Sequence, residues 1–296
     1  MDFSGHCEGG AVRMRELGIF SRTYEVKDLE ETCRRMRAQG LFHTQFNLSN
    51  AGLDTLPEHA DEEVLEKIRK ITKRYEIKLD ALSGTFNMID PDQERRKAGC
   101  RQFKEQCRIA KELGIPVVTL CTGSKHPTDK WTWHEDNLKE SSWTDLMRTT
   151  EELLGYAQEY DVVLGVETEA GNIINTPLRA RKYLDQAGSP RLKIIMDGAN
   201  LFRPEQVKDM RQVLDEAFEL LGKDIVIAHA KDFSFHGDLS FVAAGQGILD
   251  FPYYIHLLEH YGYHGPLIMH GLSEEQVPAS CRFLKRAMTE GGTLDE

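Results

Sequence analysis

Short apolar runs alternate with longer amphipathic segments from one end of the chain to the other. Eight runs of three to six residues are rich in aliphatic side chains, as expected for parallel strands that are covered on both faces. The predicted strands are Leu17–Phe20, Thr44–Leu48, Lys78–Ser83, Val117–Cys121, Val162–Val166, Leu192–Met196, Ile225–Ala228 and Leu267–Met269.

A segment with helical spacing of its apolar positions follows each of these runs. The predicted helices are Leu29–Gln39, Asp61–Tyr75, Glu94–Leu113, Trp143–Glu159, Pro177–Ala187, Pro204–Leu221, Phe251–His260 and Ser273–Met288. Typical boundary signals support several of these ends. They are the first-turn prolines Pro177 and Pro204, the capping-box pair Ser273 and Gln276, and the terminal glycines Gly40, Gly114 and Gly222.

Eight strands alternating with eight helices predict a single (β/α)8 barrel, or TIM barrel, over residues 14–296, with residues 1–13 as an N-terminal extension. A doubly wound open sheet is the competing topology. One long segment, Thr122–Ser142, shows no clear periodicity between the fourth strand and the fourth helix. A loop of that length in a compact domain is usually a lid or a binding loop.

Composition narrows the functional classes. The chain has 296 residues and a net charge of −11, which argues against binding to a nucleic-acid backbone. No basic segment leads into an apolar run at the start, and no apolar stretch approaches the length of a membrane span. Six cysteines without C-x-x-C spacing predict free thiols. They are Cys7, Cys33, Cys100, Cys107, Cys121 and Cys281. A cytoplasmic protein with no membrane partner is therefore expected.

Titratable residues end four consecutive predicted strands. In a TIM barrel, catalytic groups lie at the carboxyl ends of the strands. Glu167, Asp197, His229 and His270 occupy such positions, at intervals of 30, 32 and 41 residues. The residues two positions earlier are small or apolar, which places both sets on the inward face. These residues are Gly165, Ile195, Ile227 and Ile268.

Two carboxylates and two imidazoles suit one divalent transition ion, with Mn²⁺ as the first choice and Zn²⁺, Co²⁺ or Fe²⁺ as alternatives. Taken singly, each of the four residues is more often a helix cap, a salt-bridge partner or a hydrogen-bonded structural group than a metal ligand. Their joint placement favours the metal site.

At these residues the chain resembles the xylose-isomerase-like TIM-barrel superfamily of sugar isomerases and epimerases. The resemblance covers most of the chain and is carried by an ordered series of short segments. The segments are Leu164-Gly165-Val166-Glu167, Ile195-Met196-Asp197-Gly198-Ala199-Asn200-Leu201, His229-Ala230-Lys231-Asp232, Gly245-Gln246-Gly247 and Gly262-Tyr263-His264-Gly265-Pro266-Leu267-Ile268-Met269.

The chain departs from the family pattern at two positions. Members commonly have a second Glu at the end of the eighth strand, where this chain has His270, and many epimerases have a His where this chain has Asn200. In those epimerases a Glu on each side of the metal handles the proton. The loss of one carboxylate puts such a symmetric mechanism in doubt, although His270 is able to bind the metal or to act as the second acid–base group.

Other residues are candidates for the mouth of the barrel. Lys231 is either a stabiliser of a developing enolate or an ion-pair partner of Asp232 or a neighbouring carboxylate. Glu169 either reaches the site or points to solvent. The long loop offers aromatic and polar groups that suit a sugar. The predicted substrate-binding residues are His126, Trp131, Trp133, Asn87, Asn200 and Glu169, with His43, Gln45, Lys125 and His134 as weaker candidates. The Gly245-Gln246-Gly247 segment is expected to form a tight turn.

The resemblance implies a metal-dependent isomerase or epimerase of a ketose, keto-sugar or related polyol, in which Glu167, His270 and Lys231 are catalytic. A lyase that eliminates a group β to the carbonyl shares the first half of this chemistry and is the alternative. A non-catalytic sugar-binding subunit and a DNA-repair nuclease are weaker alternatives, the latter because the chain is acidic. The expected partners are a small carbohydrate and, as an option, further copies of the chain.

Overall fold

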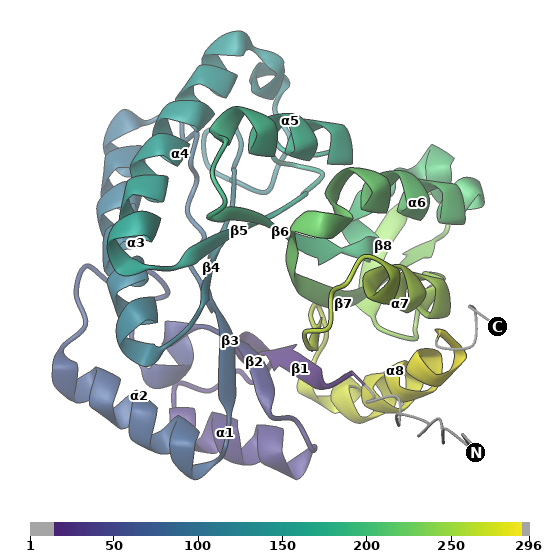
Figure 1. Ribbon diagram of the computed structural model, residues 1–296, viewed down its shortest axis with the longest axis horizontal. Helices are drawn as coiled ribbons and strands as arrows, with labels where there is room; N and C mark the ends of the chain where they lie inside the picture. The colour runs from purple at the N-terminus through teal and green to yellow at the C-terminus, as the bar shows by residue number, and fades with distance from the viewer. Residues whose placement is uncertain (1–14, 292–296) are drawn as a thin grey trace, which may run out of the picture.

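Eight parallel strands form a closed ring in the computed structural model, which describes residues 15–291 (Figure 1). In order around the ring they are β1 (Leu17–Phe20), β2 (His43–Phe46), β3 (Lys78–Ser83), β4 (Val117–Leu120), β5 (Val163–Glu167), β6 (Leu192–Asp197), β7 (Ile225–Phe235) and β9 (Leu267–Met269). Pairing of β9 with both β7 and β1 closes the ring. The predicted single TIM barrel is therefore confirmed, and the open sheet is excluded. The predicted extension, residues 1–13, lies outside the described residues.

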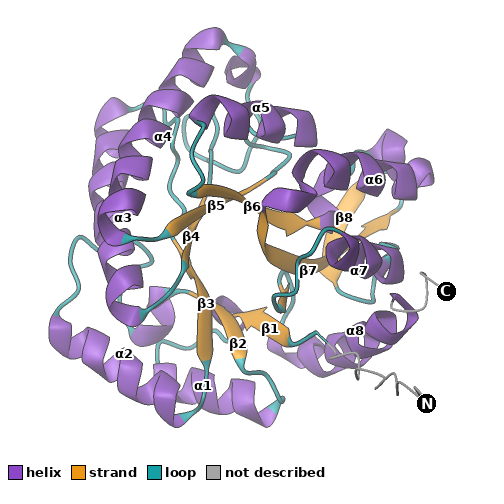
Figure 2. Cartoon of the chain, in the orientation of Figure 1, coloured by secondary structure: helices purple, strands orange, loops and turns teal. Residues whose placement is uncertain are grey.

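Helices surround the ring of strands (Figure 2). They are α1 (Leu29–Ala38), α2 (Glu62–Arg74), α3 (Gln93–Leu113), α4 (Glu140–Tyr160), α5 (Pro177–Ala187), α6 (Met210–Leu221), α7 (Phe251–His260) and α8 (Val277–Gly291). The predicted boundaries of α5 and α7 match those of the structure, because their first turns carry strong signals. At α5, the side chain of Thr176 accepts a hydrogen bond from the amide of Arg179, and Pro177 occupies the first turn.

The predicted helices Pro204–Leu221 and Ser273–Met288 each begin with a separate 3-10 helix in the structure. Pro204 begins a separate 3-10 helix, η5 (Pro204–Asp209), which precedes α6. Gly222 follows the last residue of α6, as predicted, but with a φ of −56° it does not adopt the left-handed conformation that is common at helix ends. A Cβ atom at Gly222 would lie 2.4 Å from the ring of Tyr261. This glycine therefore allows close packing against the end of α7, whereas Gly114, the predicted end of α3, has a left-handed φ of 68°.

A small apolar cluster fills the interior of the barrel. It consists of Ala81, Val117, Ile195, Ile227 and Ile268, and is separate from the larger core between strands and helices. Since side chains alternate along a strand, the residues two positions after Ile195, Ile227 and Ile268 also face inward, one layer nearer the carboxyl ends. The cluster thus forms a dry floor beneath Asp197, His229 and His270.

A hairpin extends the seventh strand beyond the barrel. β7 continues to Phe235 and pairs antiparallel with β8 (Leu239–Ala243), a strand that was not predicted. The segment after β8 wraps around the buried carboxylate of Asp232, which accepts hydrogen bonds from the amides of Gly245, Gly247 and Leu249. The Gly-x-Gly segment is therefore a tight turn around a side chain of the protein itself.

No helix among residues 15–291 is long and apolar enough to cross a membrane. Five cysteines are free and buried, as predicted; Cys7 lies outside the described residues.

Candidate metal centre

Asp197, His229 and His270 meet at the carboxyl ends of β6, β7 and β9. One potential ligand atom from each of the three lies within 4.8 Å of the others. The parallel pairing of β6 with β7 places Asp197 directly beside His229. Both side chains are buried, with exposed fractions of 0% and 1%. The strand ends thus bring together three of the four residues that were predicted as metal ligands.

The inward-facing atoms of this cluster lack hydrogen-bond partners. Within residues 15–291, Oδ2 of Asp197, Nδ1 of His229 and Nδ1 of His270 are buried and accept or donate no hydrogen bond. Oδ2 of Asp197 has an ionic contact of 3.1 Å with Nζ of Lys231, but the two imidazole nitrogens have no hydrogen bond. Leaving a buried polar atom unsatisfied costs about 1–3 kcal/mol, so these nitrogens require a partner. A carboxylate oxygen and two imidazole nitrogens form a donor set for a divalent transition ion. The residues present therefore fit a metal ion.

Neighbouring side chains fix the orientation of both imidazole rings. Nε2 of His229 lies 2.9 Å from Oε1 of Gln45, an oxygen that only accepts. Nε2 therefore carries a hydrogen, and Nδ1 is the nitrogen directed at the carboxylates. The ring of His270 stacks on His229, with centroids 5.0 Å apart, and on Phe20, with centroids 5.2 Å apart.

Glu167, at the end of β5, lies beside the three-residue cluster. Its Oε2 is 3.6 Å from Nδ1 of His229, and its Oε1 accepts a hydrogen bond of 2.6 Å from Nδ2 of Asn200. Asn200 also accepts a hydrogen bond of 2.7 Å from Nζ of Lys231, which lies 3.1 Å from Oδ2 of Asp197. The lysine is therefore paired with Asp197, not Asp232, and Asn200 links it to Glu167.

The electrostatics of the cluster follow from burial and from these pairs. Burial alone raises the pKa of Asp197, but the charges of Lys231 and His229 outweigh it and lower the pKa. Burial alone lowers the pKa of His229, but Glu167 and Asp197 raise it to about 9. Burial, reinforced by His229 and Lys231, lowers the pKa of His270 to about 3. A divalent cation at Nδ1 of His229 would therefore have to displace a proton.

A cavity of about 460 Å³ opens beside the cluster in the mouth of the barrel. Glu167, Lys231 and His270 line it, and so do Glu169 and Trp131. Burial, followed by the charge of Glu167, raises the pKa of Glu169 to about 8. Because it lines the cavity, Glu169 does not point away to solvent. The volume is within the range of about 300–1,000 Å³ that is usual for small-molecule sites.

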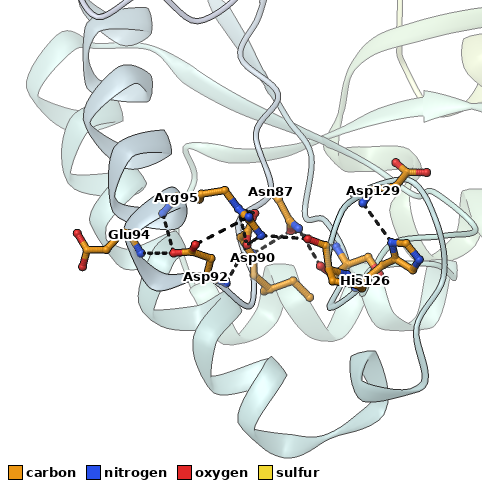
Figure 3. Close-up of polar contacts among 10 residues, drawn as sticks. Asn87, Asp90, Asp92, Glu94, Arg95, His126 and Asp129 are labelled. Atoms are coloured by element: carbon orange, nitrogen blue, oxygen red, sulfur yellow. Dashed lines mark hydrogen bonds and ion pairs between the residues drawn. The ribbon is translucent and has the colours of Figure 1, made fainter.

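Four of the six predicted substrate-binding residues do not line this cavity: Asn87, His126, Trp133 and Asn200. Asn87 holds the long loop through the backbone of Ser124, and Nδ1 of His126 accepts a hydrogen bond from the amide of Asp129 (Figure 3). Trp133 and Asn200 line a separate groove beside α5 and η5. His43 lies toward the amino-terminal end of the barrel, where it contacts Asp80 and Glu16.

Sequence reasoning missed several residues that line the cavity. Phe20 is the last residue of β1, Arg22 follows β1, Thr55 follows β2, and Phe241 is on β8. The Phe241 ring centroid is 4.1 Å from Nζ of Lys231. Phe20 was predicted only as a strand residue, and Arg22 and Thr55 carry no pattern that distinguishes them from other loop residues. Phe241 could have been found only by recognising the hairpin that carries it.

Comparison with known proteins identifies a family and a curated relative that resemble this chain. The xylose isomerase-like TIM barrel family matches residues 27–287 of the chain. A curated relative, L-ribulose-5-phosphate 3-epimerase of Shigella flexneri serotype 5b, is 23% identical over 216 residues, which cover 71% of each chain.

Three solved structures share the fold. A D-tagatose 3-epimerase-like protein has a TM-score of 0.73 and 15% identity, covering 95% of this chain and 100% of its own. The 3-keto-D-glucoside 4-epimerase of E. coli has a TM-score of 0.70 and 17% identity, with coverage of 93% and 100%. The IOLI protein, which contains a bound zinc atom, has a TM-score of 0.68 and 19% identity, with coverage of 94% and 95%. The family match spans most of the barrel, and the chain belongs to the xylose isomerase-like TIM barrel family.

Proposed function

We propose that the protein is a divalent-metal-dependent isomerase or epimerase that acts on a ketose, keto-sugar or related polyol. The observation that carries this proposal is the convergence of buried ligand atoms that make no hydrogen bond, from Asp197, His229 and His270, beside a cavity that also contains the carboxylate of Glu167. A curated relative that epimerises a ketose phosphate supports the reaction class.

The metal would be held by Asp197, His229 and His270, with Glu167 close enough to become a fourth ligand. When bound, a divalent ion polarises a carbonyl oxygen and makes the neighbouring C–H group more acidic. Mn²⁺ remains our first choice, and Zn²⁺, Co²⁺ and Fe²⁺ suit the same donors. A protein of the same fold binds zinc.

Glu167 is the residue that we assign to proton removal. Its Oε1 is held by Asn200, which leaves Oε2 nearer the cluster. Lys231 presents a cation to the same cavity, where it would stabilise negative charge that develops on a substrate oxygen. Both groups are positioned through Asn200, so base and cation keep a fixed separation.

Return of the proton is assigned to Glu169. His270 was also predicted to be able to fill this role, but one of its ring nitrogens belongs to the ligand cluster and its ring is stacked between Phe20 and His229. Glu169 lines the cavity and is outside the ligand cluster. A ligand role for His270 and an acid–base role for Glu169 are therefore the assignment that we favour.

One observation keeps the lyase as a second candidate. His270 stands where the resembling enzymes carry a second Glu, so this site has no carboxylate at the end of β9. A single base next to a polarised carbonyl is sufficient for β-elimination, in which Glu167 takes the proton and the β-substituent leaves with the electron pair.

Incorporation of solvent deuterium tests the proposal. A panel of ketoses is incubated with the Mn²⁺-loaded protein in D₂O, and deuterium at the carbon next to the carbonyl is followed by NMR. We expect exchange that EDTA abolishes and that Glu167→Gln lowers by a factor of about 100 or more. Glu169→Gln should still exchange deuterium into the substrate but form less product.

Release of a β-substituent, without an isomeric ketose, would instead establish the lyase. The absence of both exchange and elimination with every candidate metal would contradict the proposal and leave the sugar-binding subunit.

A further inference from the structure

A second groove adjoins the mouth cavity. It has a volume of about 600 Å³ and lies between the start of α3 and the loop at residues 126–131. Thr85 and Trp131 line both the groove and the mouth cavity. The two spaces therefore meet at the indole ring of Trp131, which is 45% exposed.

The backbone around Trp131 is held from three sides. Asn172, in the loop after β5, donates a hydrogen bond of 3.1 Å to the carbonyl of Lys130. Lys130 in turn donates from Nζ to the carbonyl of Thr85. The backbone of Gly171 also approaches this segment so closely that a Cβ atom there would lie 1.8 Å from the carbonyl oxygen of Trp131. The main chain that carries Trp131 is therefore fixed, and a ligand that stacks on this residue does not have to order the loop backbone.

The far side of the groove carries polar groups around this aromatic wall. Arg95 and Asp90 form an ion pair at 2.8 Å, and His126 and Asp129 lie opposite them on the loop (Figure 3). His126 uses Nδ1 to accept the amide of Asp129, so Nε2 carries the hydrogen and can donate. An aromatic face with hydrogen-bonding groups around it matches a sugar ring, which has apolar C–H faces and peripheral hydroxyls.

We propose that the substrate is a glycoside: its reacting keto-sugar occupies the mouth cavity, and a second, glycosidically linked sugar ring lies in the adjoining groove, stacked on Trp131. This inference rests on the proposed function, because it assigns the mouth cavity to the reacting sugar. Trp131 then determines specificity for the length of the substrate.

Equilibrium binding tests the inference. The probes are D-fructose and three disaccharides that carry a second hexose on fructose, at O3 (turanose), O4 (lactulose) or O6 (palatinose). Their dissociation constants for the Mn²⁺-loaded protein are measured by calorimetry. We expect at least one disaccharide to bind about tenfold more tightly than fructose, the gain expected from one well-packed aromatic contact.

Two tryptophan variants locate the second ring. In Trp131→Ala, the dissociation constant of fructose should be close to that of the preferred disaccharide, so that their ratio approaches one. Trp133→Ala is the matched control, because Trp133 is on the same loop, has a similar exposed fraction of 38% and lines the other groove. It should keep the ratio of the parent protein.

The inference is overturned if no disaccharide binds more tightly than fructose, if the preference survives Trp131→Ala, or if Trp133→Ala removes it. Binding and proton exchange separate the two proposals. A Trp131-dependent preference without deuterium exchange retains the glycoside site and contradicts the proposed reaction. Deuterium exchange into fructose without any disaccharide preference would retain the proposed reaction and contradict the glycoside site.

Discussion

Oδ2 of Asp197 and Nδ1 of both His229 and His270 are the atoms on which the metal assignment depends. Strand-end position and alternation were sufficient to predict these three residues, because both follow from the repeat of the barrel. The contacts that orient them could not be predicted. Gln45, which precedes His229 by 184 positions in the chain, contacts it across the barrel. No local sequence pattern indicates that these two residues pair.

Substitutions of His270 test its role as a ligand. His270→Ala removes one donor and should weaken metal binding by a factor of at least about 10 in a competitive chelator titration. His270→Glu restores an anionic ligand and should retain the metal. The exposed His264 provides the control, because His264→Ala should leave the affinity unchanged. Equal metal affinity in His270→Ala and the parent protein would remove His270 from the site.

We predict that His43, near the amino-terminal end of the barrel, makes the stability of the folded state depend on pH. Burial alone lowers its pKa, but contacts of 2.9 Å with Asp80 and 2.7 Å with Glu16 outweigh burial and raise it. The protonated imidazole therefore stabilises the folded state below a pH of about 6.5, and this contribution is lost as the pH rises through the folded-state pKa.

Urea unfolding of the parent protein and His43→Gln measures this effect, because their other titrating groups are the same. We expect the difference in the free energy of unfolding to be larger at pH 6 than at pH 9. A difference that stays constant, or that grows toward pH 9, would show that the imidazolium is not stabilised there.

At the scale of elements, regular strands and helices were predicted well and the added hairpin was not. The segment after Ala228 contains His229, Lys231 and Asp232, and these polar residues indicated the end of a strand. In the structure they remain in β7, because β8 supplies an antiparallel partner and Asp232 is satisfied by backbone amides. One strand was expected in each βα unit, and the pairing of β7 with β8 therefore could not be predicted from the sequence.

Asp232 should be essential to the segment that follows the hairpin. Asp232→Asn replaces one accepting oxygen with an NH₂ group that faces amide donors. We expect it to lower the free energy of unfolding by about 1–3 kcal/mol. Asp238→Asn, at the exposed end of the hairpin, should change it by less than about 0.5 kcal/mol. Similar effects of the two variants in denaturant titrations would show that Asp232 does not organise this segment.

At the scale of the whole molecule, the residues that stabilise the barrel interior and the residues of the candidate metal site lie in different layers. Ile195, Ile227 and Ile268 form a dry floor, and the ligand cluster lies on the layer above it. The alternation of strands and helices was enough to predict this architecture. The shape of the mouth was not predictable, because Arg22, Thr55 and other wall residues come from loops that meet only in the closed ring.

Metal binding should stabilise the whole barrel. A ligand at one hundred times its Kd adds about 2.7 kcal/mol to the free energy of unfolding. We therefore expect Mn²⁺ to raise Tm by several degrees in calorimetry, and EDTA to reverse the increase. Asp197→Ala should show no increase, whereas Asp80→Asn, near the other end of the barrel, should retain it. An equal increase in Asp197→Ala would mean that the ion stabilises the protein elsewhere.

Anomalous diffraction from crystals grown with Mn²⁺ tests the central claim most directly. We expect one strong anomalous peak in the mouth of the barrel, within about 2.0–2.3 Å of Oδ2 of Asp197, Nδ1 of His229 and Nδ1 of His270. The peak should be absent from Asp197→Ala crystals grown under the same conditions. A mouth without a peak, or a peak that touches none of these three atoms, would contradict the account.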